Sequence, residues 1–238
     1  MEITYIHHSG FLAETDQALL LFDFVGGPLP DLTPDKDLIV FASHRHGDHF
    51  SPKIFDLAQD HPRIRFVLSD DIWQNRVPEK INCHTEFVDP GRTLRLPDGG
   101  GICITAFKST DEGIAFMVEA GGKTIYHAGD LNDWRWKEEP LSWNNNMSAN
   151  YRRELELIHS KGFLPDVAMV PLDGRQEDLF SLGLDAFMRT VGAGTVFPMH
   201  FWEEYGLIRQ FKELECAKEY RDRIMEITEE GQVFQLEL

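Results

Sequence analysis

The sequence lacks long hydrophobic segments and contains few cysteines. No apolar run reaches the roughly 18 residues of a membrane-spanning helix. Residues 1–5 already have a strand-like pattern, so we expect neither a membrane partner nor a secretory leader. The 3 cysteines, Cys83, Cys103 and Cys216, are too few and too widely spaced for a disulfide framework. They are typical of free thiols in a reducing compartment, which predicts a cytoplasmic protein.

Positive charge is also scarce. The chain has 23 Lys and Arg against 40 Asp and Glu, which gives a net charge of −17. Such a field repels polyanions and argues against nucleic acid as a partner. Apolar residues make up 42% of the chain, enough for a packed core, and the length suits one large domain or two small ones.

The sequence instead concentrates imidazoles in one short segment, His-Arg-His-Gly-Asp-His at residues 44–49. The apolar run at 38–43 before it predicts a buried strand, and Ser51-Pro52 after it is typical of a helix start. His44 and His46 are two residues apart and can face the same way. Asp48 and His49 are adjacent and must diverge, and Gly47 allows a bend between the pairs. One loop can therefore supply ligands to two metal ions. The alternative is a His-rich surface tract, and the buried strand argues against it.

At these residues the sequence resembles the metallo-β-lactamase superfamily, whose signature is H-x-H-x-D-H after a strand. The resemblance implies an α/β (α+β) fold, a four-layer αββα sandwich of the metallo-β-lactamase type, with residues 1–238 as a single domain. A metal site would lie at one edge. We expect helices at 52–60, 148–161, 182–191 and 207–220 around many short strands.

Two later strand ends extend the resemblance. Residues 123–130 end in Gly129-Asp130, and residues 195–200 end in His200. The resemblance implies that Asp130 bridges two ions. The first ion would take His44, His46 and Asp130, and the second would take Asp48, His49, Asp130 and His200. These donors suit Zn²⁺, with Mn²⁺ or Fe²⁺ as alternatives.

One superfamily ligand is missing. A third-motif histidine normally precedes the Gly-Asp strand, but residues 107–113 contain none. Asp111 is the nearest side chain that could substitute, and His8 is a weaker candidate. The first ion could thus be weakly held, differently chosen or absent.

Four more residues are candidates for contacts around the metals or the substrate. His8 faces either the metal cleft or the core. Asp23 either braces the metal loop or forms an ordinary turn. Trp134 belongs to a Trp- and Asn-rich stretch, 131–150, which forms either a lid or pocket wall or a surface loop. Asp173 and Arg175 follow a strand, where they contact the site or form a salt-bridged turn.

The predicted activity is hydrolysis by a metal-activated water, with Asp48 and Asp130 as catalytic residues. The substrate class is a small-molecule ester, lactone, amide or phosphoester. The alternatives are a nuclease-type phosphodiesterase and a metal-binding protein without turnover. The oligomeric state stays open.

Overall fold

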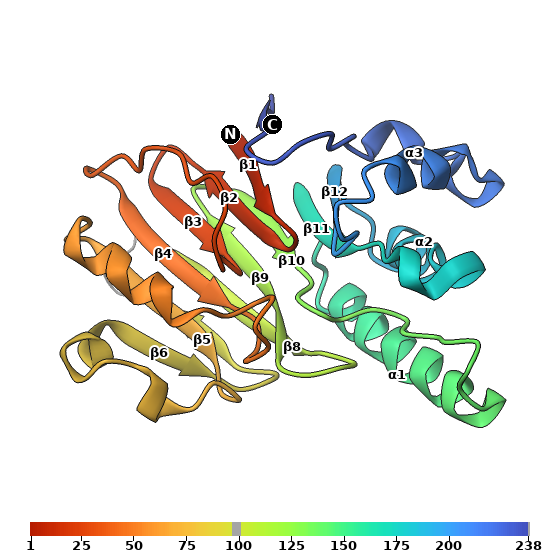
Figure 1. Ribbon diagram of the computed structural model, residues 1–238, viewed down its shortest axis with the longest axis horizontal. Helices are drawn as coiled ribbons and strands as arrows, with labels where there is room; N and C mark the ends of the chain where they lie inside the picture. The colour runs from red at the N-terminus through yellow and green to blue at the C-terminus, as the bar shows by residue number, and fades with distance from the viewer. Residues whose placement is uncertain (97–100, 238) are drawn as a thin grey trace.

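The protein is described from a computed structural model that covers residues 1–96 and 101–237 (Figure 1). Most strands are short, and the helices fall mainly in the second half of the chain. The strands are β1 (Glu2–His7), β2 (Gly10–Glu14), β3 (Ala18–Phe22), β4 (Asp37–Ala42), β5 (Ile64–Ser69), β6 (Thr85–Val88), β7 (Thr93–Arg95), β8 (Cys103–Lys108), β9 (Ile114–Ala120), β10 (Lys123–His127), β11 (Val167–Pro171), β12 (Thr195–Met199) and β13 (Val233–Gln235). The α-helices are α1 (Leu141–Ser160), α2 (Leu182–Thr190) and α3 (Gly206–Glu213), and the 3₁₀ helices are η1 (Pro52–Gln59), η2 (Gln74–Arg76), η3 (Glu79–His84), η4 (Gly174–Leu179), η5 (Glu215–Ala217) and η6 (Arg221–Arg223).

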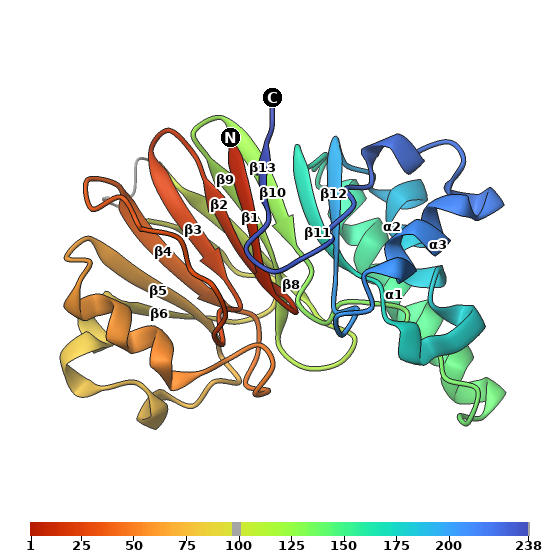
Figure 2. The same ribbon diagram turned by 45° about the horizontal axis from the view of Figure 1, so that its top comes forward.

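The strands form two mixed sheets that face each other (Figure 2). The first has the order β13-β1-β2-β3-β4-β5-β6, and β3 to β6 are parallel. The second has the order β12-β11-β10-β9-β8-β7, and β10 to β12 are parallel. Helices α1, α2 and α3 lie outside the second sheet and η1 lies outside the first (Figures 1 and 2). The predicted four-layer αββα arrangement is confirmed.

Strands β3 and β4 are buried on both faces, which explains their unbroken apolar runs. Side chains alternate along a strand. Phe22 and Phe41 therefore face the space between the sheets, where Phe41 meets Phe116 of β9 at 5.1 Å between ring centroids. Leu21 and Val40 face the other way and join a second cluster under η1. This double burial fixes the end of β4, from which the imidazole-rich loop starts.

Three of the predicted helices differ in type or extent. Residues 52–59 form a 3₁₀ helix, and α3 ends at Glu213, where Leu214 turns to extended backbone. Helix α1 begins at Leu141, so part of the Asn-rich stretch expected to be a loop is helical. Asn144 is accommodated because its amide bonds to the backbone of Trp136, outside the helix.

Two further features concern the cysteines and the length of the apolar helices. The three cysteines are unpaired. Across residues 1–96 and 101–237, no helix combines the length and the apolar character needed to cross a membrane.

Candidate metal centre

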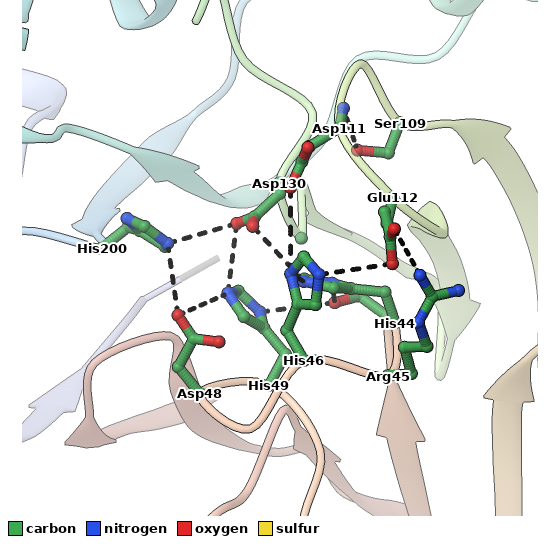
Figure 3. A network of polar contacts seen from close by, with 12 residues as sticks. His44, Arg45, His46, Asp48, His49, Ser109, Asp111, Glu112, Asp130 and His200 are labelled. Atoms are coloured by element: carbon green, nitrogen blue, oxygen red, sulfur yellow. Dashed lines mark hydrogen bonds and ion pairs between the residues drawn. The ribbon is translucent and has the colours of Figure 1, made fainter. Parts of the chain in front are cut away.

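Most of the candidate site residues lie just beyond the carboxyl ends of parallel strands, some in the first sheet and some in the second. Within a sheet such strand ends share one edge, where α/β proteins place their ligands. The imidazole-rich loop follows β4 and Asp23 follows β3, while Asp130, Asp173 and His200 follow β10, β11 and β12. Figure 3 shows the side chains of the loop converging on Asp130 and His200.

One group of donors, which we call the first cluster, consists of His44, His46, Asp111 and Asp130. His44 Nε2 lies 3.1 Å from His46 Nδ1 and 3.4 Å from Asp130 Oδ2. Asp111 Oδ2 lies 3.9 Å from His46 Nδ1. His44 is buried, whereas the side chains of His46 and Asp111 are 43% and 49% exposed. The first cluster therefore opens to solvent on one side.

The second cluster consists of His8, Asp48, His49, Asp130 and His200. Asp130 Oδ1 lies 3.1 Å from His49 Nε2 and 3.4 Å from His200 Nε2. Asp48 Oδ2 lies 3.6–4.0 Å from the Nε2 atoms of His8, His49 and His200. The two oxygens of Asp130 thus face different clusters. His8 lies with the second cluster, so the suggestion that it replaces the missing third-motif histidine at the first is wrong.

Bonds of about 2.1 Å in tetrahedral or octahedral geometry put neighbouring donors roughly 3.0–3.4 Å apart. The distances from Asp130 to histidines of both clusters, and from His44 to His46, lie in this range. The contacts of Asp48 and Asp111, at 3.6–4.0 Å, are wider. Within the two clusters, three buried atoms also lack a hydrogen-bond partner among the described residues: His8 Nε2, His49 Nε2 and Asp130 Oδ1. Buried polar atoms are nearly always hydrogen-bonded. The residues present therefore fit one or two divalent cations.

The charges around Asp130 favour a cation at the same place. Burial opposes ionisation of Asp130, but His49, His44 and His200 outweigh it and hold its pKa well below the ordinary value. Burial likewise opposes charge on His49, but Asp130 and Asp23 raise its pKa well above the ordinary value. Carboxylates that recruit a proton to a buried imidazole would recruit a metal ion still more strongly.

Asp23 is fully buried behind the imidazole-rich loop. It accepts hydrogen bonds from Ser43 N at 2.7 Å, from Ser43 Oγ at 2.6 Å and from His49 Nδ1 at 2.7 Å. Ser43 Oγ in turn lies 3.0 Å from His44 Nδ1. Burial is again outweighed, here by His127 and His49, so the pKa of Asp23 stays below its ordinary value. These contacts leave Nε2 of His44 and His49 directed at the clusters.

Asp173 contacts His200 in the same way. Its Oδ2 accepts from His200 Nδ1 at 2.9 Å, and its carboxylate also pairs with Arg175 at 2.5 Å. Burial of Asp173 is offset by these two hydrogen bonds, and its pKa falls to about 2. The strand-end contact and the salt-bridged turn, which were alternatives from sequence, therefore occur together.

His46 is contacted from its other ring nitrogen. Glu112 Oε2 lies 3.3 Å from His46 Nε2, and Glu112 Oε1 pairs with Arg45 at 2.5 Å (Figure 3). Sequence reasoning missed Glu112, and also missed Ser43 and the buried His127, which bonds to Ser9 O at 2.9 Å. The position of Glu112 in the segment that lacks the third-motif histidine was the available signal.

Backbone strain concentrates at the site. His8, Asp23 and His200 have φ values of 52°, 41° and 64°, which non-glycine residues adopt only when their surroundings enforce it. Gly129 (φ 51°) is required, since a Cβ there would lie 2.7 Å from Ser43 Cβ. Gly47 is different: a Cβ there would meet nothing within 4 Å, so the predicted need for glycine at the bend is not supported.

A cavity of about 290 Å³ opens onto both clusters. Trp134 forms part of its wall and is anchored by its indole N–H, which donates to Asp130 O at 2.8 Å. Asn144 and Gln176 hydrogen-bond the backbone of residues 133–136, so this stretch is a fixed wall and not a free lid. The lining residues are His46, Asp48, Asp111, Asp130, Trp134, Trp136, Trp143, Met147, Arg175 and His200.

The chain belongs to the Beta-lactamase superfamily domain family, whose profile matches residues 2–140. A UPF0173 metal-dependent hydrolase from Methanospirillum hungatei is 27% identical over 228 residues, which cover 88% of this chain and 86% of the relative. Other homologues carry the same name.

Solved structures show the same fold. Igni18, a metallo hydrolase from the archaeon Ignicoccus hospitalis, superposes with a TM-score of 0.70 at 19% identity and covers 99% of both chains. YhfI of Bacillus subtilis, a metallo-β-lactamase fold protein, gives a TM-score of 0.63 at 18% identity, covering 98% of this chain and 99% of its own. The metallo-β-lactamase fold predicted from the resemblance is confirmed.

Proposed function

We propose that the protein is a metal-dependent hydrolase that acts on a small-molecule ester, lactone, amide or phosphoester. The observation that carries the proposal is the position of Asp130, whose two carboxylate oxygens face two separate groups of imidazoles. Two-metal hydrolases bind their ions through such a bridging carboxylate. The names of the homologues support the same reaction class.

The site residues would serve as metal ligands, and two of the carboxylates would also act on the attacking water. His44, His46 and Asp130 would hold one cation. Asp48, His49, Asp130 and His200 would hold the other, together with His8. Zn²⁺ suits these donors, with Mn²⁺ or Fe²⁺ as alternatives. Cations bound there would supply Lewis acidity to the attacking water and to the scissile group.

Asp48 is the acid best placed to move a proton. Its side chain is 33% exposed and lines the cavity, while Oδ2 faces three imidazoles. Burial disfavours its ionised form, but the neighbouring imidazoles of His8 and His49 outweigh this and lower its pKa. Asp48 is therefore ionised at neutral pH and can accept a proton from the attacking water and pass it to the leaving group. Asp130, held between the clusters, would orient the water.

The cavity favours a small substrate with an apolar part. Trp134, Trp136, Trp143 and Met147 form one wall. Among the described residues, Arg175 is the one Lys or Arg that lines this cavity, and Asp173 already neutralises it. With a net charge of −17, this arrangement favours a small molecule over a nucleic acid.

Metal analysis and a substrate screen test the proposal. Protein purified without chelator should carry divalent metal and hydrolyse at least one lactone, ester, amide or phosphodiester. His46→Ala should abolish turnover, whereas His84→Ala, at an exposed histidine on η3, should not. Bound metal with no turnover on any class would instead support a metal-binding protein, and absence of metal would refute the proposal.

A further inference from the structure

The β8–β9 loop occupies the segment where the superfamily's third-motif histidine is absent. It is fixed from both sides. Thr110 Oγ donates to Asn132 O at 2.6 Å, and Ile114 N donates to Ser43 O at 2.9 Å. A Cβ on Gly113 would lie 2.1 Å from Ser43 O, so the loop packs directly on the start of the imidazole-rich segment. Asp111 therefore lies between residues that are anchored on both sides of it.

The Asp111 carboxylate lies among the donors of the first cluster. Ligand atoms of His46, Asp111 and Asp130 all lie within 4.8 Å of one another, and all three residues line the cavity (Figure 3). Asp111 Oδ2 lies on the Nδ1 side of His46, 3.9 Å away, while Glu112 faces the Nε2 side at 3.3 Å. The Glu112 carboxylate favours a proton on Nε2, the ring nitrogen that it faces, and this leaves the lone pair of Nδ1 for a cation.

We propose that Asp111 replaces the missing histidine as a ligand of the first ion and lowers the selectivity of that site for Zn²⁺ over Mn²⁺. This inference rests on the proposed function, in which both clusters hold divalent cations. With Asp111, the first cluster offers two imidazoles and two carboxylates. Carboxylate oxygen suits harder ions such as Mn²⁺, whereas imidazole suits Zn²⁺.

The second cluster supplies the internal comparison. It has two carboxylates, Asp48 and Asp130, as the first cluster does, but it offers three imidazoles, from His8, His49 and His200, which are at most 4% exposed. In the first cluster the side chains of His46 and Asp111 are nearly half exposed. The two sites thus differ in the number of imidazoles and in access to solvent. The second ion is the tightly held, zinc-selective one, and the first exchanges more readily.

Binding of Zn²⁺ and Mn²⁺ to the metal-depleted full chain tests this proposal without an activity assay. Titration calorimetry and metal analysis after dialysis give the number of ions and the affinity for each. Asp111→Asn should keep the second ion and weaken the first by at least roughly 10–100-fold, the loss seen when even an indirect partner of a ligand is removed. Asp111→His should restore binding of the first ion and raise its Zn²⁺-to-Mn²⁺ affinity ratio by about tenfold or more.

Asp56→Asn, at an exposed carboxylate on η1, is the matched control and should bind like the wild type. Retention of the second ion by Asp111→Asn shows that the variant is folded. If Asp111→Asn binds both ions with unchanged affinity, or Asp111→His leaves the ratio unchanged, the role of Asp111 is refuted while the hydrolase proposal stands. If the wild type binds neither ion, both proposals fail.

Discussion

Replacement of Asp23 by asparagine should change which ring nitrogen of His49 carries the proton. The Oδ2 atom of Asp23 accepts from Ser43 Oγ and from His49 Nδ1, while Oδ1 accepts from Ser43 N. In Asp23→Asn the amide oxygen must stay opposite Ser43 N, so the NH₂ group faces His49 Nδ1. Two donors cannot bond each other, and neutral His49 must then carry its proton on Nε2, 3.1 Å from Asp130 Oδ1.

The lost contacts give the expected loss of metal affinity and of stability in Asp23→Asn. A proton on His49 Nε2 removes the lone pair that faces the second cluster. Loss of such a bracing partner costs roughly 10–100-fold in metal affinity, which is about 1.4–2.7 kcal/mol. The charge-assisted hydrogen bond is lost without metal as well, and buried bonds of this kind contribute roughly 1.5–3 kcal/mol to the free energy of unfolding.

Two measurements check this prediction. Zn²⁺ titration calorimetry gives the affinity of the second cluster. ¹⁵N NMR of the imidazoles, recorded on the metal-free protein at a pH high enough to make His49 neutral, identifies the nitrogen that carries its proton. Asp16→Asn is the control, because Asp16 is exposed and precedes the same strand that Asp23 follows. Wild-type affinity together with a proton still on His49 Nδ1 would show that Asp23 does not set the tautomer.

Three further predictions concern stability and the cavity wall. Asp173 has a folded-state pKa of about 2, below its unfolded value of about 3.9. Its carboxylate therefore adds roughly 2–3 kcal/mol to the free energy of unfolding above pH 4, and this contribution is lost as the pH falls towards 2. Asp173→Asn should therefore flatten the acid limb of the stability curve between pH 4 and 2, followed by denaturant unfolding. Gly113→Ala should lower the free energy of unfolding by about 2–4 kcal/mol, because φ is +68° and the new Cβ overlaps Ser43 O. In the same assay Gly47→Ala should change the free energy of unfolding by no more than about 0.5 kcal/mol, because its new Cβ meets nothing within 4 Å. Trp143 lines the cavity without contacting either cluster. Trp143→Ala should therefore raise KM for the substrate found by screening several-fold and change kcat little. A fall in kcat alone would contradict this.

The convergence of distant strand ends was predictable from sequence through the resemblance. The strands β10 and β12 share one sheet, whereas β4 belongs to the other, so strand order alone does not bring His44 to Asp130 and His200. The resemblance grouped these three residues before any coordinates. The start of α1 could not be predicted, because asparagine disfavours helix interiors and the hydrogen bonds of Asn144 to Trp136 are tertiary.

The direction of side chains in loops could not be predicted from sequence either. The backbone of His8 is left-handed, and no local sequence pattern predicts the turn that directs its ring at the second cluster. Asp111 could be named as a substitute only by proximity in sequence. Its position beside His46 depends on the packing of Gly113 against Ser43, a contact between segments about 70 residues apart.

The acids that contact the imidazoles determine which ring nitrogen faces each cluster. Asp23 and Asp173 contact Nδ1 of His49 and His200, so both rings present Nε2 to the second cluster. Glu112 contacts Nε2 of His46, so that ring presents Nδ1 to the first. A carboxylate that holds one nitrogen protonated makes the other a better ligand. Loss of Glu112 should therefore weaken the first ion and spare the second, whereas loss of Asp173 should do the reverse, since neither acid contacts a histidine of the other cluster.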